Sequence, residues 1–387
     1  MANRGLARAR EIMGARQERV DALQKEGKKI IGYMALHVPL EIIDAVGMVP
    51  YRLLGDIREP VTEADRGLPA AFCPYMRSML DLTLKGKLDF LDGLALAHYC
   101  DAQEKTVRIM TSMVDFPFSH FIDVPTTVHD YSLAFFTTQV EDFKKTLEQY
   151  AGTTVSDDRL RQAIDVRNEQ RALVRELYDR KKSTPPALSG RETLEVILSI
   201  QSLPAEEGNA LLREVLDEVE DRDQQGAEGK VRVLVWGSII DDPAYLEVIE
   251  SSGADVVIDD LDGGTRPYTT DVETTGDLVR QLSKKYLVGT STPRTVVDAG
   301  EGPPKKDNIR DLAARFKHVK RFIDDWNVDG VLLQSVRYCD PHGYELVDVM
   351  DYMRHLEVPA IYVEHNYSEG AFAPLRTRVE AFIETLE

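Results

Sequence analysis

The sequence predicts an α/β fold with two parallel-sheet domains. Short apolar runs of strand character alternate with helix-periodic segments in both halves of the 387-residue chain. A charged, helix-periodic stretch separates the halves, and the length is sufficient for two domains that each bury a core. We expect an N-terminal helix and an α/β domain over residues 1–228, with a helical extension at about 139–225, and a second α/β domain over 229–387.

The first half is expected to open with a helix over residues 5–28 and a strand within 28–36. Pro39 suits the first turn of the next helix, Gly47 its end, and the run 49–54 the next strand. This strand–helix–strand order is typical of Rossmann- or flavodoxin-like sheets.

The second half repeats the plan. Residues 230–238 are expected as a strand, 241–253 as a helix that Pro243 begins and Gly253 ends, and 254–260 as a strand. The same sheet type is therefore predicted twice.

The charge of the chain excludes some partners. Lys and Arg number 47 against 66 Asp and Glu, a net charge of −19 that would repel nucleic acid and anionic membranes. The sequence contains no apolar run of the roughly 18–20 residues that a membrane helix needs. We expect a cytoplasmic protein.

Several sequence motifs with well-known chemistry are missing from the sequence. Neither G-x-x-x-x-G-K-[ST] nor G-x-G-x-x-G occurs, so nucleotide binding by those loops is not expected. H-E-x-x-H, G-x-S-x-G and C-x-x-C are also missing. The cysteines are the remaining candidate site.

The positions of two cysteines are informative. Asp92-Gly93 leads an apolar run into Cys100, and Asp329-Gly330 leads another into Cys339. Each cysteine follows a tyrosine at the expected carboxyl end of a buried strand, where parallel sheets collect ligands.

A third cysteine, Cys73, precedes Pro74, which suits the start of a helix whose amides favour a thiolate. Three cysteines are too few for a disulfide framework in a protein of this size. Thiolates from separate elements could converge on one iron–sulfur cluster and leave one iron open.

Two other interpretations of the cysteines stay open at this point. They could be buried structural thiols. Alternatively, one could be a nucleophile beside a histidine, Cys100 with His98 or Cys339 with His342.

Candidate substrate contacts lie near the first two cysteines. Arg77 and Arg108 could bind a phosphorylated substrate tail, or belong to a solvated helix face. His37 and Tyr99 could line the same crevice, or lie at the edge of the core.

Taken together, several segments resemble one known family, the benzoyl-CoA reductase and 2-hydroxyacyl-CoA dehydratase subunits. The segments are PLEIIDAVGMVPYRLLGD (39–56), CPYMRSMLD (73–81), HYCD (98–101), DDPAYLEVIESSGADVVIDDLDGGTRPY (241–268), YCDPHGYE (338–345) and VEHNYSEGAFAPLRTRVEAFIETLE (363–387).

The resemblance implies a catalytic subunit that pairs with a related cluster-binding subunit. It implies that Cys73, Cys100 and Cys339 hold a [4Fe-4S] cluster near an acyl-CoA thioester. A separate ATP-hydrolysing iron–sulfur activator, supplied indirectly by ferredoxin, would deliver a low-potential electron. Reduction to a ketyl-type radical anion would then lead to ring reduction or to loss of water.

YCDPHGYE and the chain length look more like the smaller, C-type subunit of ATP-dependent (class I) benzoyl-CoA reductase. The expectation is an oxygen-sensitive enzyme of anaerobic aromatic degradation that makes a cyclic dienoyl-CoA, with His342 and His98 as candidate catalytic residues. A 2-hydroxyacyl-CoA dehydratase subunit is the first alternative, and a cluster-free small-molecule-binding module the second. One departure from the family is Asp262 in DLDGGTR, where many members have a cysteine, so a larger cluster is not expected.

Overall fold

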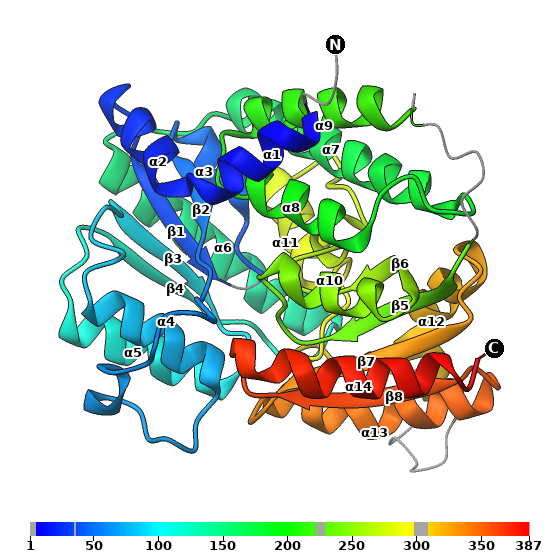
Figure 1. Cartoon of the computed structure of the whole chain (residues 1–387). Coiled ribbons are helices and arrows are strands. Elements are labelled where there is room, and N and C mark those ends of the chain that lie inside the picture. The colour runs from blue at the N-terminus through cyan, green and yellow to red at the C-terminus, as the bar shows by residue number, and fades with distance from the viewer. Residues whose placement is uncertain (1–4, 35, 221, 223–228, 298–308, 387) are drawn as a thin grey trace.

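The computed structural model describes residues 5–34, 36–220, 222, 229–297 and 309–386. These residues form two four-stranded parallel sheets with helices on both faces, as Figure 1 shows. The predicted α/β class is therefore confirmed. None of the helices in the described ranges is long and apolar enough to cross a membrane.

The two sheets have the same strand order. The first is β2-β1-β3-β4 and the second β6-β5-β7-β8, and all pairs are parallel. The strands are β1 (Ile30–Met34), β2 (Val49–Arg52), β3 (Gly93–Ala97), β4 (Ser119–Ile122), β5 (Val231–Gly237), β6 (Ala254–Asp260), β7 (Gly330–Val336) and β8 (Ala360–His365). The strand–helix–strand repeat read from the sequence thus corresponds to a repeat in topology.

Helices cover both faces of each sheet, which explains the continuous apolar runs of the strands. Successive residues of β1, Ile30 and Ile31, belong to separate cores on the two faces of the first sheet. The helices are α1 (Gly5–Gly14), α2 (Arg16–Lys25), α3 (Leu40–Ala45), α4 (Pro74–Leu84), α5 (Asp101–Met113), α6 (Asp130–Ala151), α7 (Asp157–Asp179), α8 (Gly190–Ile200), α9 (Ala205–Glu220), α10 (Pro243–Ser251), α11 (Leu278–Leu287), α12 (Ile309–Asp325), α13 (Asp340–His355) and α14 (Phe372–Ile383).

The expected N-terminal helix over 5–28 is in fact two helices. Ala15 leaves the helical conformation between α1 and α2, with φ −118° and ψ 33°. Leu6 of α1 packs in the core beside the second sheet, whereas Val20 and Leu23 of α2 pack in a core of the first sheet. The break lets one segment serve two cores, which helical periodicity alone does not reveal.

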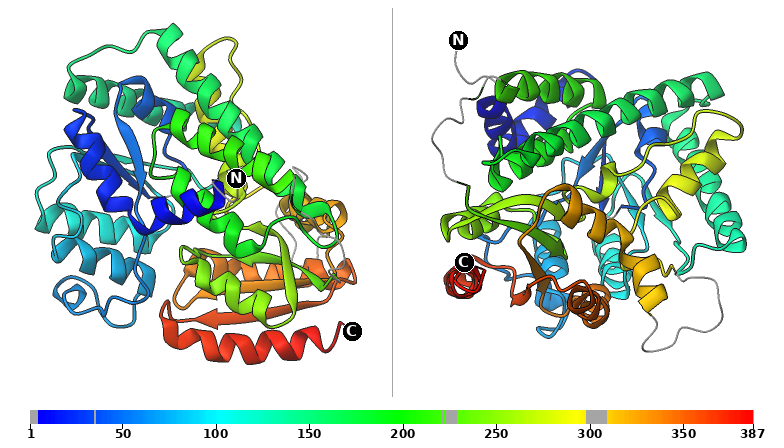
Figure 2. Two further views of the ribbon diagram at one scale, coloured as in Figure 1. Left: turned by 45° about the horizontal axis from the view of Figure 1, so that its top comes forward. Right: turned by 90° about the vertical axis from the view of Figure 1, so that its right-hand side faces the viewer.

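The halves exchange helices. Helices α7, α8 and α9 contribute to the same core as β5 and β7, although they precede the second sheet in the chain. Conversely, α11 packs against α6 beside the first sheet, as the views in Figure 2 also show. Residues 223–228 lie outside the described ranges, and the domain boundary at 228/229 stays a prediction.

One glycine allows β5 and β7 to approach closely at the end of β5. Gly237 has φ +147°, and a Cβ added there would lie 1.8 Å from the Gln334 carbonyl oxygen. Only glycine fits this close approach.

The buried carboxylate of Asp241 joins the two halves of the chain near the end of β5. Asp241 accepts hydrogen bonds from the Gly55 backbone N–H at 2.9 Å and from the Tyr367 hydroxyl at 2.6 Å. Burial raises the pKa of Asp241 from 3.8 to about 6, although these hydrogen bonds oppose the rise.

This carboxylate should make stability depend on pH. The folded state holds the Asp241 proton more tightly than the unfolded state, so the free energy of unfolding should fall as pH rises from about 4 through 6. Relative to Asp241→Asn, which does not titrate, the free energy of unfolding of the wild type should fall by about 3 kcal/mol over that window. Urea unfolding at several pH values measures it, and a difference that is constant with pH would contradict the assignment.

Candidate functional site

The three cysteines share one local position. Cys73, Cys100 and Cys339 are the N-cap residues of α4, α5 and α13. Pro occupies the first turn of α4 and of α13 and suits a helix start, while the Cys100 sulfur accepts a hydrogen bond from the Gln103 backbone N–H at 3.4 Å. Each sulfur therefore lies at the positive end of a helix dipole, which favours negative charge on sulfur.

The fold brings the three cysteines to one cavity of about 60 Å³. It lies where the carboxyl ends of strands from both sheets meet. The residues that line it are Met34, Arg52, Cys73, Tyr75, Met76, Tyr99, Cys100, Gln103, Ser238, Ile239, Asp262, Val336, Cys339 and His342. The thiols of separate elements thus converge, as a shared site would require.

The surroundings of the thiols disfavour a free thiolate nucleophile. Burial raises the pKa of Cys73 to about 11 and that of Cys100 to about 12, and it raises the pKa of Cys339 well above its ordinary value. Burial is the main cause of the raised Cys339 pKa, and negative charge on Cys73 and Cys100 raises it further, so added positive charge would favour deprotonation of all three thiols. A metal core held by these cysteines would supply that charge and favour the thiolate form of its ligands.

A buried ion network lies beside the cysteines. The Arg266 guanidinium contacts Asp260 at 2.9 Å and Asp262 at 2.7 Å, and the Tyr99 hydroxyl donates to Asp262 at 3.2 Å. His318 contacts the other oxygen of Asp260 at 3.1 Å. Arg266 was not predicted as a site residue, although two carboxylates and an arginine within DLDGGTR were a signal for such a pair.

His342 connects this network to a cysteine. Its Nδ1 lies 3.4 Å from the Cys339 sulfur and its Nε2 lies 3.1 Å from an Arg266 nitrogen. Burial, together with the Arg266 charge, holds the pKa of His342 well below its usual value. A neutral ring held between sulfur and guanidinium orients the Cys339 thiol, and a catalytic role for His342 stays a prediction.

The other two predicted histidines do not line the cavity. His37 is fully buried, neither of its ring nitrogens has a hydrogen-bond partner among the described residues, and burial lowers its pKa to about 3. Its ring lies 6.1 Å from that of Tyr99, which does line the cavity. His98 lies 3.1 Å from Asp123 and 3.3 Å from Arg294.

His98 also belongs to a group of potential metal ligands. Its ligand atom and those of Asp101 and Glu104 lie within 4.8 Å of one another. Within this group, Glu104 pairs with Arg108 at 2.7 Å, and a nitrogen of Arg294 lies 3.3 Å from the His98 ring.

Neither of the two predicted arginines lines the cavity. Arg77 donates to the carbonyl oxygens of Leu68 and Pro69 at 2.8 Å and pairs with Asp65, which fixes the loop before Cys73. Arg108 pairs with Glu104 at 2.7 Å and lies over the Phe121 ring. Their role in substrate binding stays a prediction.

A different arginine, Arg52 at the end of β2, is the cation among the residues that line the cavity. It is 3% exposed, and among the described residues it forms no ion pair with a carboxylate. A charged residue in an otherwise apolar strand was the signal for it in the sequence.

The fold and the site together define an α/β protein with a three-thiol site between two parallel sheets. The chain belongs to the family described as 2-hydroxyglutaryl-CoA dehydratase, D-component, whose model matches residues 35–386. The resemblance read from the sequence is therefore confirmed.

Relatives match over nearly the whole chain. The C-type subunit of benzoyl-CoA reductase from Thauera aromatica is 27% identical, over 93% of this chain and 91% of that protein. The (R)-phenyllactyl-CoA dehydratase beta subunit of Clostridium sporogenes is 23% identical, over 94% and 93%. The beta subunit of the (R)-2-hydroxyglutaryl-CoA dehydratase of Acidaminococcus fermentans is 23% identical, over 93% of both chains.

Removal of the Arg266 charge should strongly destabilise the fold. Arg266→Met leaves Asp260 and Asp262 buried without their cation, and breaking a buried pair costs about 3–5 kcal/mol. Arg354→Met, which breaks an exposed pair with Asp351, should change the free energy of unfolding by less than about 0.5 kcal/mol. Urea unfolding compares the two, and equal losses would contradict this account.

Proposed function

We propose that this chain is the iron–sulfur subunit of an ATP-dependent benzoyl-CoA reductase, which reduces an aromatic acyl-CoA thioester to a cyclic dienoyl-CoA. The observation that carries the proposal is the convergence of three helix-capping thiols on one buried cavity in a member of this family. Similarity to the C-type subunit of benzoyl-CoA reductase supports the reductase branch.

In this proposal Cys73, Cys100 and Cys339 hold a [4Fe-4S] cluster. The donor set suits such a group, because three thiols leave one iron position free for another ligand. When bound, the cluster supplies single low-potential electrons to the thioester.

The chain itself prepares the cavity electrostatically. Three helix N-termini and the Arg52 guanidinium balance negative charge on sulfur. Arg266 keeps His342 in contact with the Cys339 thiol.

The apolar side chains around the sulfurs exclude water. Met34, Met76 and Val336 line the cavity and are almost completely buried. Their hydrophobic surface keeps the dielectric low, so that the local charges act strongly on redox chemistry.

The partners follow from the same proposal. The chain would pair with a related cluster-binding subunit and receive electrons from an ATP-hydrolysing iron–sulfur activator that ferredoxin supplies. All three relatives above are named as subunits of acyl-CoA enzymes, which supports a subunit role here. His37, Arg77, Tyr99 and Arg108 remain the proposed substrate contacts, and His98 and His342 the proposed catalytic histidines.

A dehydratase subunit is the second candidate. The matching family model carries a dehydratase description, and two of the relatives above are dehydratase subunits. The same three-thiol site would serve both reactions.

Replacement of Cys100 should separate cluster binding from folding. Cys100→Ser keeps an N-cap acceptor for the Gln103 N–H, so helix content should stay unchanged. Iron and sulfide in the anaerobically purified protein should fall severalfold, as in Cys100→Ala, because a thiolate ligand is lost. Ser112→Ala, on the same helix, is the matched control. Full iron in both Cys100 variants would refute the proposed ligand set.

The choice of substrate distinguishes the two reactions. The complex with its partner subunit and activator should convert benzoyl-CoA to a dienoyl-CoA in an ATP-dependent assay, measured by product analysis. Water loss from 2-hydroxyacyl-CoA thioesters without any dienoyl product would replace the reductase assignment by the dehydratase one.

A further inference from the structure

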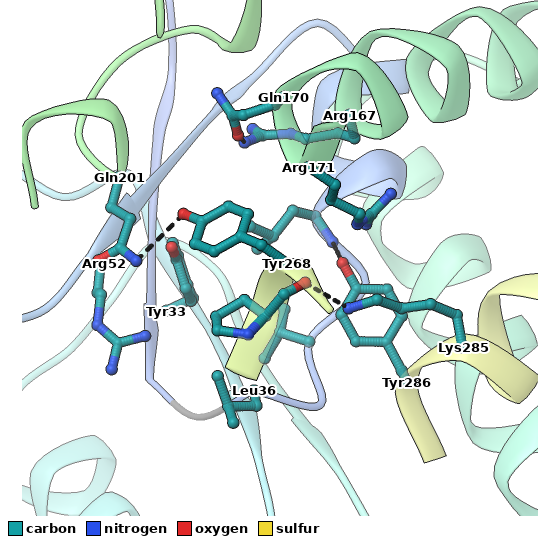
Figure 3. A pocket seen from close by; sticks show the side chains of 13 residues that line it. Tyr33, Leu36, Arg52, Arg167, Gln170, Arg171, Gln201, Tyr268, Lys285 and Tyr286 are labelled. Atoms are coloured by element: carbon teal, nitrogen blue, oxygen red, sulfur yellow. Dashed lines mark hydrogen bonds between the residues drawn. The ribbon is translucent and has the colours of Figure 1, made fainter. Parts of the chain in front are cut away.

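Most cations of the pocket between the two sheets are engaged within the protein. Figure 3 shows this pocket, in which Arg167 and Arg171 each pair with a carboxylate of α3. Lys285 donates to a backbone carbonyl at 3.0 Å, and burial lowers its pKa well below the ordinary value. The Arg52 guanidinium lies on the far side of the pocket from Lys285. Little of this positive charge is free to meet one ligand.

A larger pocket with free cations lies beside the Arg266 network. Its volume is about 350 Å³. Pockets for small molecules have volumes of roughly 300–1,000 Å³, so a small organic ligand fits this space. The residues that line it are Val128, Asp260, Arg266, Thr269, Thr270, Val288, Gly289, Thr290, Ser291, Thr295, Val297, Ala314, Arg315, Lys317, His318 and Arg321.

One face of α12 lines this pocket. Ala314, Lys317, His318 and Arg321 follow one another at the three- and four-residue intervals that place side chains on the same side of a helix. The Cβ atoms of Lys317 and Arg321, one turn apart, are therefore about 5–6 Å from each other. Two long cationic side chains at this spacing can contact the same ligand group.

These two cations have free donors. Among the described residues, neither Lys317 nor Arg321 forms an ion pair or a hydrogen bond, and both side chains are exposed. Arg321 lies over the Phe322 ring, 5.6 Å from its centroid, and this contact leaves its N–H groups free. Lys320 does not line the pocket and pairs instead with Asp324.

The charge of these cations is not offset by the acidic residue that lines the pocket. Asp260 contacts Arg266 at 2.9 Å and His318 at 3.1 Å, so its carboxylate already has cationic and hydrogen-bonding partners. A cleft lined by charge of one sign concentrates counter-ions. This cleft is positive in a chain whose net charge is −19, so it is the place where an anion is favoured.

The lining suits a phosphate group. A phosphate ester carries a charge of about −1.5 to −2 at pH 7 and three oxygens that accept hydrogen bonds, so it can meet both cations at once. The Ser291 hydroxyl, which has no hydrogen-bond partner among the described residues, adds a further donor. Val128 and Val288 line the same pocket and suit the organic part of an ester.

The pocket is separate from the cysteine cavity. Asp260 and Arg266 line the pocket, whereas Asp262 and His342 line the cysteine cavity. Arg266 contacts Asp262 at 2.7 Å and His342 at 3.1 Å, so the buried network stands between the two spaces. A ligand in this pocket does not occupy the space beside the sulfurs.

We propose that this pocket binds a phosphate group between Lys317 and Arg321, at a site separate from that of the acyl-CoA thioester. The phosphate has two possible sources, inorganic phosphate or a small phosphorylated metabolite. This binding goes beyond the proposed function and does not depend on which reaction the chain supports.

Isothermal titration calorimetry of the full chain, in a phosphate-free buffer of constant ionic strength, tests the binding. Inorganic phosphate and n-butyl phosphate should each bind one site per chain. The double variant Lys317→Met/Arg321→Met should weaken both at least about tenfold, roughly the value of one charge-assisted hydrogen bond. Tighter binding of the ester identifies a phosphorylated metabolite as the ligand, and equal binding identifies inorganic phosphate.

Matched variants are available on the same helix. Lys320→Met removes a cation that does not line the pocket and should keep the phosphate affinity. Lys317→Arg/Arg321→Lys retains both charges and should keep most of the affinity. Because these side chains are exposed, circular dichroism should show unchanged helix content in every variant. Equal phosphate affinities of the wild type and the double Met variant, or an equal loss in Lys320→Met, would overturn the proposal.

A titration of the assembled complex tests whether the site is separate. Phosphate should bind with the same affinity before and after addition of one equivalent of the acyl-CoA thioester that the complex converts. Displacement of phosphate by that single equivalent would assign the pocket to the thioester and overturn the proposal. The iron content and the proposed reaction are measured independently, so they stand if phosphate does not bind.

Discussion

The meeting of two parallel sheets at their carboxyl ends is the constraint on which the site depends. Residues at or just beyond the ends of β1, β2, β3, β5, β6 and β7 all line the cysteine cavity. Parallel strands place their following loops and helix starts at one edge of the sheet. Two such edges face each other here, so cysteines that are far apart in the sequence become neighbours.

The site also contains two buried arginines whose charges are treated differently by the fold. Arg266 is neutralised by Asp260 and Asp262, whereas Arg52 has no carboxylate partner among the described residues. The first arrangement fixes geometry, because a satisfied network holds its members rigidly. The second places a buried guanidinium in the cavity, which suits anionic sulfur.

Much of the fold could be predicted because apolar periodicity is a local property. The strands predicted at 230–238 and 254–260 correspond to β5 and β6 within one or two residues. The convergence of the cysteines could also be expected, since Cys100 and Cys339 follow strand ends. The break at Ala15 could not, because it depends on which core each half of the segment meets.

The charged groups around the site were harder to predict than the fold. Tyr99 and Asp262 are hydrogen-bonded across 163 positions of sequence, and no local pattern reports such a pair. The contacts of Arg77 illustrate the opposite problem, since a cation near a cysteine can be engaged by its own loop.

The exchange of helices between the halves has a consequence for motion. Helix α7 takes part in both cores, because Leu160 and Ile164 pack beside the first sheet whereas Val174 and Leu177 pack beside the second. A hinge opening between the sheets would therefore have to disrupt one of these two sets of contacts. The two sheets are thereby tied into one cooperative unit whose subglobal opening is costly. A hinge motion that separates the two sheets is therefore disfavoured. Access to the cysteines would depend on side chains and loops at the edge of their cavity.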